Sequence, residues 1–209
     1  MHAPVSLPRA AAIAAASLFA AAVAGFGALH AGFSQVEHPV AALGASGVAN
    51  AAAFNMTAFV APGALGAFVA QALRARMTQA RFVARLGVQV LTLAALAFGA
   101  LGVLPLDSHD LLAPASNAHA AAWTMWWVAF AAGATLLAVG MRGTRHARTS
   151  RGVFLCAVVA LAFAIMLPGL VAVGLSQRLA FAAWFVALVA FAPTGTEASS
   201  PGSPRTGRA

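Results

Sequence analysis

The chain has 209 residues, of which 62% are hydrophobic and only 8% are charged, and its formal net charge is +8. Soluble domains average about 25% charged residues, so this composition excludes a soluble globular fold, which needs a polar shell. All twelve basic residues are arginines in short clusters between apolar runs, and no nucleic-acid motif appears, so the charge predicts orientation in a membrane rather than nucleic-acid binding.

Six apolar runs predict an all-α polytopic membrane protein, because most of them approach the roughly 20 residues that a helix needs to cross a bilayer. A polar N-terminal segment, residues 1–9, precedes them and ends on Arg9. The predicted spans cover residues 10–29, 47–73, 86–104, 120–141, 153–175 and 179–192. The first run is longer than the apolar region of a signal peptide, typically about 7–15 residues, so we predict that it is a retained span.

Prolines and polar residues interrupt several of these runs. Pro62-Gly63 is expected to kink the second span, and Pro168-Gly169 interrupts the fifth. A tight turn is predicted at residues 176–178. It leaves about 14 residues for the last run, so an interfacial helix is the alternative to a sixth crossing. The Pro-, Gly- and Ser-rich residues 193–209 are expected to be disordered.

Three tryptophans lie near the predicted start of the fourth span: Trp123, Trp126 and Trp127. Tryptophan favours the boundary between membrane and water, so these residues predict the point at which the helix enters lipid. Six glycines within the spans are expected to allow close approach of helices: Gly25, Gly27, Gly63, Gly66, Gly99 and Gly102.

The arginines predict how the chain is threaded. With six spans and the N-terminus inside, eleven of the twelve arginines lie on the inner side, and only Arg178 lies outside. Because this bias falls in short loops, the positive-inside rule places both termini in the cytoplasm. Three of the four acidic residues, Glu37, Asp107 and Asp110, then face the periplasm of a bacterial inner membrane.

The connection from Leu104 to His119 concentrates polar chemistry between two spans. Asp107 and His119 lie near the ends of antiparallel neighbouring helices, so their side chains are candidates for a pair. An Asp–His pair can orient an imidazole as a general base or support a metal ligand. The alternative is a hydrogen-bonded clip that fixes the connection at the surface.

Two further polar groups have both a functional and a structural interpretation. Asn55 lies in the second span and is expected to face the bundle, either in an interhelical hydrogen bond or as a ligand contact in an outward cavity. Ser34 is a candidate nucleophile if His38 or His119 reaches it, and otherwise a candidate helix cap. The outward-facing carboxylates and histidines are residue types that zinc accepts, but without HExxH or a Cys/His spacing we predict no metal site and no cofactor.

Several short motifs follow one another in a specific order. The first half contains Ser34-Gln35, His38-Pro39, Gly44, Phe54-Asn55 and Pro62-Gly63. The second half contains Leu104-Pro105-Leu106-Asp107, then His119-Ala120-Ala121-Ala122-Trp123, Trp126-Trp127 and Phe130. Over residues 10–192 this order resembles the domain of unknown function 998 family. The resemblance implies a multi-span helical fold in a bacterial inner membrane and no established activity.

The sequence thus predicts a small polar site open to the periplasmic side, built from Ser34, His38, Asn55, Asp107 and His119. The predicted function is non-catalytic, either structural or of a binding or transport type, with membrane lipids as partners and a lipid or small molecule as ligand. The alternative is a membrane-embedded hydrolase that acts at the outer interface. The first is favoured because no catalytic constellation has a diagnostic spacing. No feature of the sequence indicates an oligomeric state.

Overall fold

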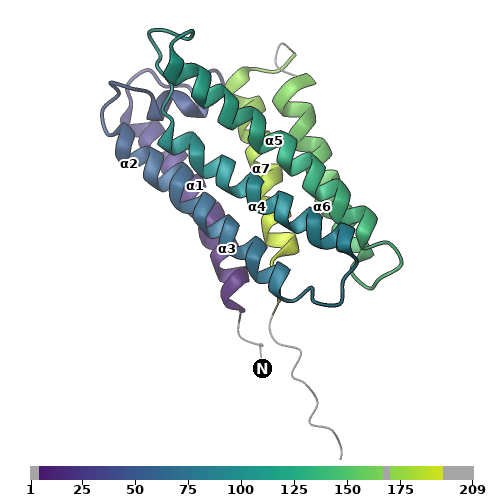
Figure 1. Cartoon of the computed structure of the whole chain (residues 1–209). Coiled ribbons are helices and arrows are strands. Elements are labelled where there is room, and N and C mark those ends of the chain that lie inside the picture. The colour runs from purple at the N-terminus through teal and green to yellow at the C-terminus, as the bar shows by residue number, and fades with distance from the viewer. Residues whose placement is uncertain (1–4, 167–169, 195–209) are drawn as a thin grey trace, which may run out of the picture.

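Helices account for almost all of the ordered architecture in the computed structural model of the chain, which describes residues 5–166 and 170–194 (Figure 1). Within these residues, six helices are long and apolar enough to cross a membrane. The predicted all-α polytopic fold is therefore confirmed.

The crossings follow one another along the chain. The first is α1 (Leu7–Leu29), and the second combines α2 (Ala51–Asn55), the π-helical turn η2 (Met56–Val60) and α3 (Ala61–Ala75). The third and fourth are α4 (Phe82–Val103) and α5 (Pro114–Gly140). The fifth combines α6 (Ala147–Leu161) and the π-helical η3 (Ala162–Met166), and the sixth is α7 (Val173–Phe191). A short 3-10 helix, η1 (Val40–Gly44), lies between the first two crossings.

The interruption predicted at Pro62 takes the form of a π-helical turn. Pro62 lies in the first turn of α3, directly after η2. A proline lacks the backbone N–H donor and collides with the carbonyl four residues earlier in a regular α-helix, and a π-helical turn relieves that collision by widening the helix. The second predicted interruption, at Pro168-Gly169, lies outside the described residues.

The boundary between the last two crossings differs from the prediction. Helix α7 begins at Val173 and runs for 19 residues, so residues 176–178 lie in its first turns and not in a tight turn. Their polar groups are satisfied by other segments, since the Ser176 hydroxyl donates to the Phe163 carbonyl and Gln177 Oε1 accepts a 3.0 Å hydrogen bond from the backbone N–H of Val40. The predicted spans 153–175 and 179–192 therefore had the wrong boundary, and α7 is long enough to cross.

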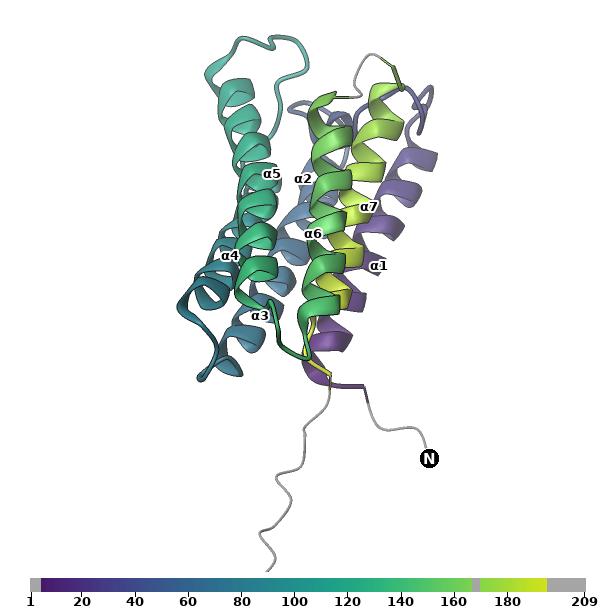
Figure 2. The same cartoon turned by 90° about the vertical axis from the view of Figure 1, so that its right-hand side faces the viewer.

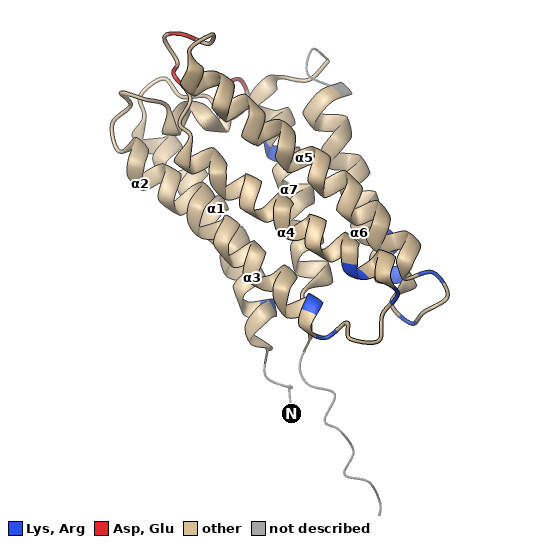
Figure 3. Cartoon of the chain, viewed as in Figure 1, with Lys and Arg blue, Asp and Glu red and all other residues tan. Residues whose placement is uncertain are grey.

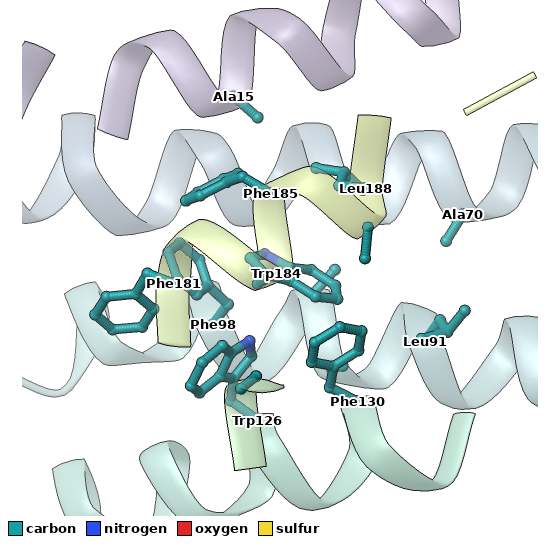
Figure 4. Packing of buried hydrophobic residues seen from close by; sticks show 14 of the residues in the cluster. Ala15, Ala70, Leu91, Phe98, Trp126, Phe130, Phe181, Trp184, Phe185 and Leu188 are labelled. Carbon is teal, nitrogen blue, oxygen red and sulfur yellow. The ribbon is translucent and has the colours of Figure 1, made fainter. Parts of the chain in front are cut away.

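An aromatic cluster around Phe98 of α4 forms the centre of the bundle (Figure 4). Phe98 is fully buried, and its ring centroid lies 5.4 to 6.5 Å from six other aromatic rings. These rings come from α1, η2, α5 and α7: Phe19, Phe59, Trp126, Phe181, Trp184 and Phe185. The cluster therefore joins crossings that are distant in the sequence.

The tryptophans predicted near the start of the fourth span lie further along the helix than expected. Trp126 is fully buried, and its ring lies 5.0 Å from those of Trp123 and Phe181. Helix α5 begins at Pro114, nine residues before Trp123, so the tryptophans lie well inside the helix. Trp126 therefore packs in the core, and its position at the lipid boundary stays a prediction.

Glycines bring neighbouring helices into direct backbone contact. A Cβ atom on Gly63 of α3 would lie 2.6 Å from Gly99 Cα of α4, and one on Gly87 of α4 would lie 2.6 Å from the backbone nitrogen of Leu137 in α5. The close approach predicted for Gly63 is therefore confirmed. The same prediction is wrong for Gly25, which has no atom within 4 Å of an added Cβ.

The charged residues separate toward opposite ends of the bundle (Figure 3). We call the end with connections 76–81 and 141–146 the arginine end, and the end with connections 30–50 and 104–113 the acidic end. Arg178 is at the acidic end, because its guanidinium bonds to Gln35 in the first of these connections. This separation agrees with the arginine bias from which the threading was predicted.

Candidate functional site

Hydrogen bonds from its own side chains and from α5 hold the 104–113 connection in place. Asp107 Oδ1 accepts hydrogen bonds from the backbone N–H groups of His109, at 2.9 Å, and Asp110, at 3.3 Å. His119 Nδ1 lies 2.7 Å from the Leu104 carbonyl oxygen and donates to it. Asp107 and His119 therefore bond to nearby backbone and not to each other, which favours the structural clip over a catalytic pair.

Asn55 also fastens a connection at the acidic end. Its side chain is buried, as predicted, and its Nδ2 donates a 2.9 Å hydrogen bond to the Gly44 carbonyl at the end of η1. An added Cβ on Gly44 would overlap the Asn55 amide. The partner is thus a connection between crossings and not another membrane helix, and the amide holds η1 against the second crossing.

Ser34 and His38 lie together in a turn. The Ser34 hydroxyl oxygen accepts from the backbone N–H groups of Val36, at 3.3 Å, and Glu37, at 3.1 Å. His38 Nδ1 accepts a 2.9 Å hydrogen bond from the Ser34 backbone N–H. These bonds form a capped turn. The His38 imidazole bonds to the backbone of Ser34 and not to its hydroxyl, which a catalytic base would have to activate.

The five predicted site residues share one end of the bundle without forming one hydrogen-bonded site. Ser34, His38 and Asp107 lie in the two connections, whereas Asn55 ends α2 and His119 lies in α5. The two connections meet where the Ser46 N–H donates to the Leu106 carbonyl at 2.8 Å. Ser34 and His38 bond to each other, whereas Asn55, Asp107 and His119 bond to backbone groups. Among residues 5–166 and 170–194, no group of three or more His, Cys, Asp or Glu side chains is placed to hold a metal ion.

A second polar network at the acidic end joins α1 to α7. Arg178 Nε and Nη2 donate to Gln35 Oε1 at 3.0 and 2.6 Å, and Nη1 donates to the carbonyl oxygens of His38, at 3.0 Å, and Gly174, at 2.8 Å. Gln35 Nε2 in turn donates to the Val23 carbonyl of α1 at 3.0 Å. The half-buried guanidinium is thereby held in one position between two crossings.

This network lies at the wall of a groove of about 760 Å³ between α1 and α7. The two helices contact each other and lie side by side in the bundle (Figure 2). Four alanines spaced four residues apart, and therefore on one face of α1, line the groove: Ala16, Ala20, Ala24 and Ala28. On the opposite wall, Ala182 and Phe185 follow Arg178 along α7. The groove is apolar except for the Gln35–Arg178 network.

The sequence contained one signal for this network. Arg178 is the single arginine that the threading places on the outer side, and Gln35 belongs to the Ser34-Gln35 motif. Neither residue belongs to the predicted site, because the sequence pattern predicts a turn at Arg178 and the contact bridges 143 residues. The groove itself follows from the pairing of α1 with α7, which no local pattern predicts.

No protein-family model, no curated protein and no solved structure matches this chain. The geometry of the acidic end is therefore the basis for the proposed function.

Proposed function

We propose that this chain is a non-catalytic, multi-pass protein of the bacterial inner membrane that binds a lipid or small amphipathic molecule between α1 and α7. The observation that carries this proposal is the 760 Å³ groove, with apolar walls and one fixed cation. Concave, mostly apolar sites with a few convergent polar groups are typical of small-ligand binding. Membership of the domain of unknown function 998 family remains part of the proposal, supported by the motif order.

The local hydrogen bonds favour this function over the hydrolase. A nucleophile needs a base within hydrogen-bond reach of its hydroxyl, and a third group that orients the base. In this structure the Ser34 hydroxyl caps a turn, His38 accepts from the backbone, and His119 donates to the Leu104 carbonyl. These side chains already have structural roles, so they support a binding protein.

Filling the groove tests the proposed function. We expect Ala24→Phe to lower the occupancy of bound lipid at least tenfold, because Ala24 is exposed and lines the groove. The measurement is native mass spectrometry of the full chain in detergent, with added phosphatidylethanolamine and phosphatidylglycerol. Ala21→Phe is the matched control, since Ala21 is exposed on α1 outside the groove. Equal lipid occupancy in the two variants would contradict the proposal.

The proposed threading has its own test. With both termini in the cytoplasm, the 104–113 connection faces the periplasm and the 141–146 connection faces the cytoplasm. Alkaline phosphatase fused within the first connection is expected to be active, and the same fusion within the second is expected to be inactive. The reverse pattern would show that the arginine end faces outward.

A further inference from the structure

The charge of Arg178 is not balanced by the groups that hold it. All four of its hydrogen bonds end on neutral oxygens, two on Gln35 Oε1 and two on backbone carbonyls. Within the described part of the chain it makes no ion pair with a carboxylate. The guanidinium carbon also lies 5.7 Å from the centroid of the Phe33 ring, a cation–π contact with another neutral group. A half-buried cation surrounded by neutral partners favours an anion from outside the protein as its counter-charge.

The guanidinium also keeps one donor for such an anion. An arginine side chain has five N–H bonds, and four of them point to the acceptors already described. The fifth belongs to Nη2, whose other N–H donates to Gln35. Because Gln35 is itself anchored to the Val23 carbonyl, the cation is positioned before any ligand binds.

The dimensions of the groove indicate which kind of group is attached to the anion. The α1 wall runs from Ala16 to Ala28, which corresponds to about 18 Å at about 1.5 Å per residue. One leaflet of a bilayer contributes about 15 Å of hydrocarbon, half of the roughly 30 Å core. The groove therefore extends over about the depth of one leaflet, which suits an acyl chain better than a small soluble anion.

The order of groups along α7 agrees with this orientation. Arg178 lies in the second turn of the helix, and Ala182 and Phe185 line the groove four and seven residues further from the acidic end. A cation near the membrane surface followed by an apolar channel is complementary to an anionic headgroup followed by a hydrocarbon tail.

We infer that the groove binds an anionic phospholipid from the leaflet at the acidic end, with its phosphate on Arg178 and an acyl chain along the alanine face of α1. This inference rests on the proposed function, because it identifies the ligand class of the same groove. Gln35 acts as a positioning residue, since its Oε1 accepts two hydrogen bonds from the guanidinium and holds it in place.

The test compares phosphatidylglycerol with zwitterionic phosphatidylethanolamine on the intact chain. Native mass spectrometry gives the ratio of the two bound lipids from an equimolar mixture. Arg178→Gln is expected to lower the preference for phosphatidylglycerol about fivefold, the size expected for one arginine near a membrane surface. Arg81→Gln, at an exposed residue of the arginine end, removes the same charge and is expected to leave the ratio unchanged.

A second pair of variants keeps Arg178 and its hydrogen bonds, so that the test does not depend on the folding of Arg178→Gln. Ala182 is exposed in the groove one turn from Arg178. A glutamate there can pair with the arginine at the i,i+4 spacing. The phosphatidylglycerol preference is expected to be lower in Ala182→Glu than in Ala182→Gln, which differs from it only in charge.

The outcomes separate this inference from the function on which it rests. Suppose that Ala24→Phe loses bound lipid, but that the lipid ratio is the same in Arg178→Gln as in Arg81→Gln and the same in the two Ala182 variants. The groove then binds a neutral amphiphile, so the inference of an anionic lipid fails while the proposed function stands. Inorganic phosphate that displaces phosphatidylglycerol at low concentration would show a soluble anion site and overturn it. A dimer whose abundance falls in Ala24→Phe would show that a second copy fills the groove, and would overturn it too.

Discussion

Replacing Gly87 by valine is expected to lower the free energy of unfolding by about 3 kcal/mol, the upper part of the range for overpacked cores. A Cβ atom at this position would lie 2.6 Å from the Leu137 nitrogen and 2.9 Å from the Gly133 oxygen. Both are backbone atoms of α5 that no rotamer change can move, so α4 and α5 must separate. The measurement is unfolding of the purified protein in mixed micelles with increasing sodium dodecyl sulfate.

Gly25→Val is the matched control for this change. Gly25 also lies within a membrane-crossing helix, α1, but an added Cβ there meets no atom within 4 Å. Both variants replace glycine by the same β-branched residue, so their difference isolates the contact between helices. Equal unfolding midpoints for the two variants would show that the close approach of α4 and α5 contributes little stability.

Truncating the central aromatic residue, Phe98→Ala, is expected to cost about 3–5 kcal/mol. Lipid chains are as apolar as the core, so the loss comes from the cavity and the missing ring contacts rather than from transfer of the side chain out of water. Phe98 contacts rings from four other helical segments, so one truncation weakens several crossings at once.

The control for Phe98 is a phenylalanine that leaves no cavity when it is shortened. Phe68 of α3 is 43% exposed, so Phe68→Ala removes the same atoms from the outer face of the bundle. Its unfolding midpoint is expected to stay close to that of the wild type, whereas the midpoint of Phe98→Ala shifts strongly. Similar shifts of the unfolding midpoint in Phe98→Ala and Phe68→Ala would show that the aromatic cluster contributes little to the stability of the bundle.

The fold was predictable because it depends on a property that is local in sequence. Each crossing is built on a long apolar run, and arginine clusters separate several of these runs. The boundary near Ser176 was not predictable in this way, because its hydroxyl and the Gln177 amide bond to Phe163 and Val40 in other segments. Polar residues that find partners within the protein do not end a helix.

The candidate site was predicted less completely than the fold, because it too depends on hydrogen-bond partners in other segments. Asn55 was expected to face the interior, and it does, but its partner is the carbonyl of Gly44 in a connection. Asp107 and His119 lie near one connection as expected, and each bonds to backbone instead of to the other. The sequence indicates which residues are polar and near one end, whereas the partners depend on tertiary contacts.

The groove lies between α1 and α7, and the two residues whose hydrogen bonds join its walls, Gln35 and Arg178, are 143 positions apart. During synthesis, α1 enters the membrane long before the ribosome reaches α7. An incomplete chain that ends before α7 therefore carries the alanine face and Gln35 with no cation beside them. The proposed capture of a headgroup then requires a chain that has already inserted α7, and a bound molecule would link two helices inserted at widely separated times.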